Sequence, residues 1–163
     1  MNRFAEEANY WDTTVSPAKS QGEIMEMLGS FGADSTMVAQ GRSGGKYAWM
    51  IRFQWQERNY RFAFTPLDCS LPDKISSFGG NKRKHQEQAK YQMGRIAVHF
   101  VKAILTAAET QPGALFGFLE LPNVAAHPGG VPYIASEVDI STFVETIPLL
   151  PDLIQGDGEW HNA

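Results

Sequence analysis

KYAWMIRFQW, residues 46–55, is the stretch that decides the fold. Every second residue is large and apolar, a period of two that is typical of a strand with one buried face. Residues 60–64 resume the alternation after a turn over residues 56–59, so the two runs predict an aromatic hairpin. Its rings are also candidates for stacking on nucleic-acid bases, an alternative that stays most open for Trp55, next to the turn. The residues expected in the core are Tyr47, Trp49, Ile51, Phe53, Phe62 and Phe64.

Two helices are predicted, one before this hairpin in the sequence and one after it. The first spans residues 20–31, because Ser20 and Glu23 have the spacing of a capping box and Gly32 is placed to end the helix. The second runs from near Lys84 to near Glu109, with apolar residues at helical spacing on one side. Its other side is expected to form an outward-facing polar and basic stripe of Lys84, Gln88, Gln92, Arg95, His99 and Lys102.

Weaker patterns complete the chain. Residues 35–40 suggest a short strand, and the glycines of residues 41–45 suit a tight reversal. Two prolines bracket the start of a loop that runs to Asn81. Near the end, residues 115–121 suggest a strand and residues 136–147 a short helix.

The order of these elements predicts an α+β fold. A small antiparallel sheet of three or four strands is expected to pack against two helices, in the order α-β-β-β-α. We expect a single domain over residues 1–163, with the core in 1–110 and a Pro-rich, acidic extension in 111–163. No apolar run is long enough to span a bilayer, and the N-terminus lacks the features of a signal peptide. With the single Cys69, these features favour a cytoplasmic protein.

Charge is strongly segregated along the chain. Residues 42–102 contain 12 of the 14 Lys and Arg residues and only four acids, a local charge of +8. Residues 103–163 contain eight acids and no Lys or Arg, a local charge of −8. A basic block of this kind favours a polyanionic partner, whether nucleic acid, phosphate or an acidic protein surface.

The densest group of cations is Lys82-Arg83-Lys84, which is expected at the start of the long helix. Cations oppose the macrodipole there, and an anion bound at the backbone N–H groups would relieve that cost. The competing interpretation is a solvated loop that precedes the helix, since runs of charge often serve only solubility.

Catalytic and metal-binding patterns are not found in the sequence. The four histidines lack metal-ligand spacing, Cys69 has no partner motif, and Gly44-Gly45-Lys46-Tyr47 lacks the Ser or Thr of a phosphate-binding loop. His99 is interpreted as a residue of the polar stripe. The acids after residue 119 include candidates for a carboxylate pair, but the sequence brings no two of them together.

Several segments resemble an uncharacterised family of short proteins from bacteriophages and actinobacterial mobile elements. The similar segments are Phe4-Ala5-Glu6, Thr14-Val15-Ser16, Ser20, Glu23-Ile24, Leu28, Phe31-Gly32-Ala33, residues 61–67, residues 101–107 and residues 147–151. The chain departs from the family pattern in residues 68–82 and 122–135. The resemblance implies a mobile-element setting and no catalytic residues.

A second likeness, of topology alone, is to the double-stranded RNA-binding domain. That domain also runs α-β-β-β-α and has a basic cluster at the start of its second helix, which meets phosphates across the grooves. Lys82-Arg83-Lys84 and Lys90 occupy a comparable place in this sequence. The long loop and the acidic extension are not typical of such domains, so the likeness serves as analogy only.

Three functions are compatible with these features. The favoured one is a non-enzymatic DNA- or RNA-binding protein without a cofactor, contacting phosphates through the helix stripe and the polar face of the sheet. The alternatives are an anti-defence inhibitor that binds a host protein complex, and a small nucleotide-directed enzyme, which convergence of carboxylates and a His in a closed pocket would favour. The predicted nucleic-acid-binding residues are Lys46, Arg52, Arg61, Lys82, Arg83, Lys84, Lys90, Arg95 and Lys102.

Overall fold

The structure, a computed structural model, describes residues 3–121 and 130–138. Contacts divide the chain into a unit that ends at Leu119 and a unit that begins at Glu120. The second unit contains the pairing of Glu120 with Ile134 and the short helix η3. In chain order the elements are η1 (Ala5–Glu7), α1 (Pro17–Phe31), β1 (Ser35–Ser43), β2 (Lys46–Trp55), β3 (Arg58–Phe64), β4 (Ile75–Phe78), β5 (Asn81–Lys84), α2 (His85–Thr110), η2 (Pro112–Phe118) and η3 (Ala135–Glu137).

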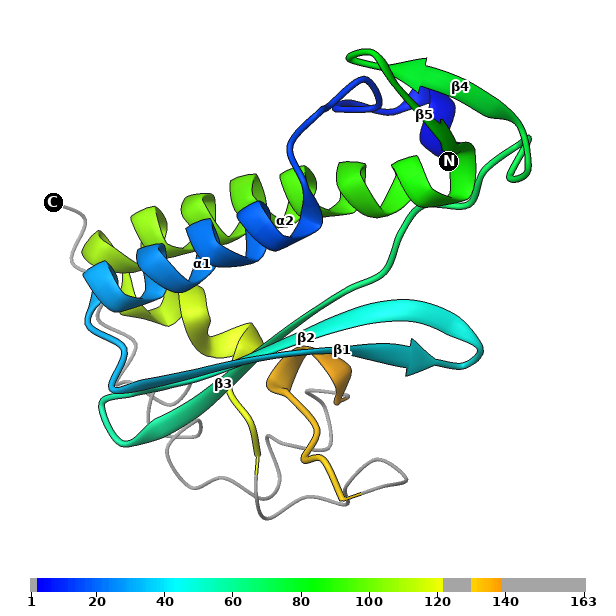
Figure 1. Cartoon of the computed structure of the whole chain (residues 1–163). Coiled ribbons are helices and arrows are strands. Elements are labelled where there is room, and N and C mark those ends of the chain that lie inside the picture. Colours follow the sequence, from blue (N-terminus) through cyan, green and yellow to red (C-terminus); the bar gives the residue numbers. More distant parts are fainter. Residues whose placement is uncertain (1–2, 122–129, 139–163) are drawn as a thin grey trace, which may run out of the picture. The chain divides into compact units, whose positions relative to one another are not determined.

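The α+β class predicted from the sequence is confirmed. Strands β1, β2 and β3 form an antiparallel sheet in that order, and α1 and α2 lie side by side over one of its faces (Figure 1). A separate two-stranded ribbon, β4–β5, precedes α2. β4 was predicted as part of a loop, and the cations of β5 were predicted at the start of the long helix. The turn of the ribbon is Gly79-Gly80, whose φ angles of 60° and 87° favour glycine, and this signal was present in the sequence.

The predicted aromatic hairpin forms the centre of the core. Trp49, Ile51, Phe53 and Phe62 are at most 2% exposed. Tyr47, Phe64 and Trp55 are partly buried and pack against the same cluster, and the Trp55 ring lies 5.0 Å from that of Phe31 in α1. The period of two therefore reports burial against the two helices, as expected for a sheet covered on one face.

Both predicted helices are present, and their boundaries differ in an informative way. α1 begins at Pro17, and its N-cap is Ser16, whose side chain accepts a hydrogen bond from the Lys19 amide at 3.2 Å. The capping box predicted at Ser20 is therefore wrong, whereas Gly32 ends α1 in the left-handed conformation as predicted. α2 covers the predicted helix almost to the residue.

Of the two elements predicted after α2, the strand over residues 115–121 differs from the structure. Residues 112–118 form the 3-10 helix η2 rather than a strand, and only Leu119 and Glu120 make strand-like bridges. The predicted helix over residues 136–147 lies mostly outside the described residues, which include only its first three positions. No helix within the described ranges is long and apolar enough to cross a membrane.

The two helices meet the sheet at Gly94 of α2. A Cβ at this position would lie 2.9 Å from Ser20 Oγ in α1 and 3.2 Å from the Trp49 ring in β2. Both separations are shorter than ordinary van der Waals contact. Ser20 is fully buried at this point, so a small residue on each helix allows α1, α2 and β2 to pack in direct contact.

The face of α2 predicted as an outward-facing stripe is covered in its middle, whereas Lys84, His99 and Lys102 of the stripe are exposed. Gln88 and Gln92 are completely buried, because residues 5–13, the N-terminal arm, run across them. The Gln88 amide donates to the carbonyl oxygens of Trp11 and Thr13 at 2.7 and 2.8 Å. The Gln92 amide donates to the carbonyl oxygens of Ala5 at 2.8 Å and Asn9 at 2.9 Å, so these side chains bind backbone instead of solvent.

Gly94→Ala should destabilise the protein by about 1 to 3 kcal/mol, because the added methyl overpacks the contact of α1, α2 and β2. Gly22→Ala in α1 is the matched control, since nothing lies within 4 Å of a Cβ there. On helix propensity alone this control should stabilise by up to about 1 kcal/mol. Urea denaturation measures both, and an equal effect of the two substitutions would contradict the packing account.

Gln88→Ala should release the N-terminal arm, at a cost of about 1 to 3 kcal/mol for each buried carbonyl left without a donor. Hydrogen exchange of the amides in residues 5–13 should accelerate in this variant. Gln86→Ala is the control, at an exposed position two residues earlier in the same helix, and it should leave the exchange unchanged. Unaltered protection of the arm in Gln88→Ala would show that other contacts hold it.

Candidate nucleic-acid interface

The predicted binding residues come from four elements. β2 carries Lys46 and Arg52, β3 carries Arg61, β5 carries the three consecutive cations, and α2 carries the last three residues. The cations of β5 lie in a strand, and only Lys84 reaches the helix, as its N-cap. They were predicted either at the start of the long helix or in a solvated loop that precedes it. The strand β5 differs from both predictions.

Arg95 belongs to the contact between the helices. Its guanidinium donates to Glu23 Oε2 at 2.8 Å and to Ser20 Oγ at 3.2 Å, both in α1. The Arg95 side chain is only 16% exposed. A ligand would have to compete with this ion pair, so Arg95 serves helix packing better than phosphate binding.

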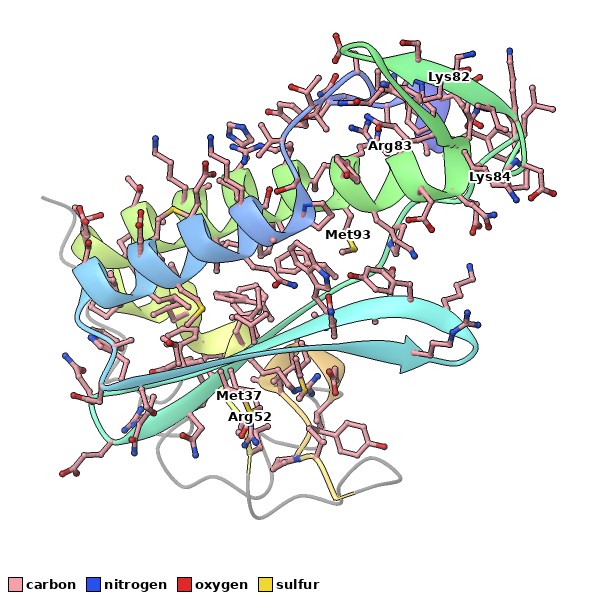
Figure 2. The ribbon with its side chains drawn as sticks, viewed as in Figure 1. Met37, Arg52, Lys82, Arg83, Lys84 and Met93 are labelled. Atoms are coloured by element: carbon pink, nitrogen blue, oxygen red, sulfur yellow. The ribbon has the colours of Figure 1, made fainter. Side chains whose placement is uncertain are left out.

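Arg52 and Arg61 lie directly opposite each other in neighbouring strands. The alternation places them on the face of the sheet turned away from α1 and α2, where Figure 2 labels Arg52 and Met37. Arg61 is 6% exposed and Arg52 is half-buried. This face therefore offers less accessible charge than the sequence pattern implied.

Arg83 turns inward, unlike its two neighbours. Its guanidinium lies 4.0 Å from the centre of the Tyr91 ring and donates to Gln88 Oε1 at 2.8 Å. Lys82 and Lys84 are exposed and extend from the ribbon at the start of α2 (Figure 2). Strand alternation explains the split, because neighbouring residues point to opposite faces.

Besides the inward-turned Arg83, six cations lie on the β4–β5 ribbon and the loop before it, at the start of α2 and at the β1–β2 turn, and we call this group the basic end. The loop before β4 supplies Lys74, whose carbonyl accepts the His85 amide at 2.9 Å and so lies beside the start of α2. Lys74 and Arg42 are not among the predicted binding residues, although Arg42 stands at the glycine reversal. The basic end consists of Arg42, Lys46, Lys74, Lys82, Lys84 and Lys90.

A cleft of about 410 Å³ opens at the basic end. The tip of the β1–β2 hairpin, the loop of residues 66–72 and the first turns of α2 form its walls. Arg42, Lys46 and Lys90 line it, together with Tyr47 and Gln86. Cations from both the hairpin and the helix thus border one concave surface.

Two of these lysines pair with exposed acids. Lys46 Nζ lies 3.1 Å from Asp68, and Lys90 Nζ lies 3.0 Å from Glu87 and 4.6 Å from the centre of the Tyr47 ring. Exposed ion pairs contribute only about 0 to 1 kcal/mol, so an incoming phosphate can exchange with either carboxylate. The positive charge of the cleft is therefore available to a ligand.

Lys102 is separated from the basic end. It is exposed and borders a different groove, between α1 and α2. At the helical rise it lies about 27 Å from Lys84 along α2. One short ligand segment cannot contact both, so the predicted continuous strip is divided by distance as well as by the covering arm.

Cys69 also lines the cleft, in surroundings that disfavour its thiolate form. Burial and the negative charges of Glu6 and Asp68 raise the pKa of Cys69 to about 11. The thiolate is the nucleophilic and metal-binding form, so it is scarce at neutral pH. Within the described ranges, no three His, Cys, Asp or Glu side chains gather as a metal site would require.

Family models, curated proteins and solved structures were all compared with this chain, and none matches it.

Cys69 should react with iodoacetamide at pH 8 roughly 10-fold more slowly in the folded protein than in the same protein in urea, because a roughly 100-fold lower thiolate fraction is partly offset by the greater nucleophilicity of a more basic thiolate. The thiolate fraction falls because the pKa rises from 9.0 to about 11. The folded rate should continue to rise with pH up to that value. A folded rate within a few-fold of the unfolded one would contradict the raised pKa.

Proposed function

We propose that this protein binds nucleic acid through its basic end, as a phosphate-contacting protein of a phage or mobile element. The supporting observation is the gathering of six cations from three strands, a loop and a helix at the basic end. Of these, Arg42, Lys46 and Lys90 line the cleft, together with the acids Asp68 and Glu87. An excess of this kind raises the local concentration of a polyanion and gains free energy from released counterions.

The proposal concerns contacts to the backbone of the nucleic acid. Lysine ammonium groups are point charges without the fork geometry that reads base edges, and five of the six cations are lysines. Binding through them should depend on salt far more than on sequence. The choice between DNA and RNA, and between one strand and two, is an outcome of the binding experiment.

The second hypothesis, an inhibitor that docks on a host protein through acidic residues, rests mainly on another part of the chain. Of the eight acids in residues 103–163, the structure describes Glu109, Glu120 and Glu137. The other five lie outside the described residues. We therefore base the proposed function on the basic end, whose residues are all described.

The double substitution Lys82→Ala with Lys84→Ala should weaken binding to all sequences alike and lower the salt slope of log K by about 2. Both side chains are exposed, and Lys84 makes no capping hydrogen bond with its side chain, so the fold should be preserved. Fluorescence anisotropy with labelled duplex and single-stranded DNA and RNA, over a series of salt concentrations, measures the effect.

The matched control is Lys19→Ala with Lys102→Ala, which removes the same charge from exposed positions on α1 and α2. It should leave the affinity close to that of the unaltered protein. An equal loss in both double variants would point to net charge rather than to the basic end. Absence of binding to every probe at low salt, together with a protein-like 260/280 ratio after purification without nuclease, would refute the proposal.

A further inference from the structure

A buried cluster beside the basic end joins three side chains that are distant in sequence. His85, the first residue of α2, has its Nε2 atom 2.9 Å from Ser76 Oγ in β4. The other ring nitrogen, Nδ1, lies 3.0 Å from Glu6 Oε1 in the N-terminal arm. A hydroxyl, an imidazole and a carboxylate are thus connected in series through the two ring nitrogens.

The hydrogen-bonding roles follow from the charge on Glu6. Burial acts to raise the pKa of Glu6, but hydrogen bonds from the backbone amides of Ser70 and Leu71 and from His85 outweigh it and hold the pKa at about 2. Glu6 is therefore a carboxylate and accepts only, so Nδ1 of the neutral ring carries the proton. Nε2 then has a lone pair and accepts from the Ser76 hydroxyl.

The surroundings hold the imidazole in this orientation. The His85 side chain is 6% exposed, and the edges of the Trp11 and Phe78 rings meet it with centroids 4.9 and 6.2 Å away. Ser76 itself is only half-buried, so its hydroxyl lies at the boundary between the cluster and solvent. A locked base beside a partly accessible hydroxyl is the arrangement that activates a serine nucleophile.

The ribbon also supplies a backbone donor next to Ser76. In a two-residue hairpin the closing pair, here Phe78 and Asn81, exchanges both ladder hydrogen bonds. The next pair, Ser77 and Lys82, is then a wide pair whose N–H groups point away from the partner strand. The amide that follows Ser76 is therefore directed outward, where it can donate to an oxyanion.

We propose that Ser76 and His85 form the catalytic pair of a second activity, the hydrolysis of carboxylic esters, with Glu6 as the residue that positions His85. Ser76 Oγ attacks the ester carbonyl while its proton passes to His85 Nε2. The bond to the leaving alcohol breaks, and that alcohol takes the proton from His85. Water then attacks the acyl-Ser76 ester, His85 again accepts and returns a proton, and the free acid leaves.

This activity is independent of nucleic-acid binding, and its test contains no nucleic acid. The purified full chain is incubated with a fluorophosphonate probe, and the labelled residue is identified by peptide mass spectrometry. Release of p-nitrophenol from p-nitrophenyl acetate is followed in parallel. We expect a single adduct on Ser76, with displacement of fluoride, and hydrolysis above the buffer rate.

Variants separate the roles of the three residues. Ser76→Ala should abolish labelling, whereas Ser30→Ala, the same substitution at an exposed serine of α1, should retain it. His85→Gln should slow labelling roughly 100-fold or more, the usual contribution of a general base. Glu6→Gln should slow it more than Glu6→Asp does, because only the second change keeps a carboxylate; circular dichroism verifies that each variant is folded.

The unaltered protein alone can overturn the proposal. Absence of an adduct on Ser76 after prolonged incubation would show that the cluster only ties the arm to the ribbon. Labelling of Ser77, or labelling of Ser76 that persists undiminished in folded His85→Gln, would equally exclude base-activated catalysis. None of these three results would bear on the binding measured with Lys82→Ala and Lys84→Ala.

Discussion

The hydrogen bonds from two buried glutamine amides to the N-terminal arm are the interaction on which both sites depend. Gln88 and Gln92 project from α2 on the side opposite the sheet and bind carbonyl oxygens of residues 5–13. This arm then brings Glu6 against His85, and Glu6 in turn accepts the amides of Ser70 and Leu71. One helix thus organises the core on one side, and the arm, the loop and the ribbon on the other.

Much of the fold was predictable because it follows from burial periodicity. The alternation in residues 46–55 and 60–64 required a sheet covered on one face, and the apolar side of α2 supplied the cover. The C-cap at Gly32 was predictable for a local reason, since glycine readily adopts the left-handed conformation that commonly ends a helix. The ribbon β4–β5 is short and polar, so no hydrophobic period revealed it.

The candidate sites were harder to predict because polar spacing does not identify the partner of a polar group. A stripe at intervals of three and four residues places its members on one helix face but leaves open whether water, an ion pair or backbone meets them. Gln88 donates to a backbone carbonyl, Arg95 forms an ion pair with Glu23, and Lys84 is exposed to solvent. Glu6, Ser76 and His85 had no shared motif, because three separate segments contribute them.

The sequence separation of the arm contacts also shapes how the molecule can assemble. The strands β1, β2 and β3 pair through short turns, whereas Gln92 and Ala5 close a loop of 87 residues. Loop-closure entropy rises with length, and contacts of long range form only after the segments between them are in place. A growing chain must therefore hold its first residues undocked until α2 has been synthesised, so the Glu6–His85 junction is created only after the ribosome has released most of the first unit.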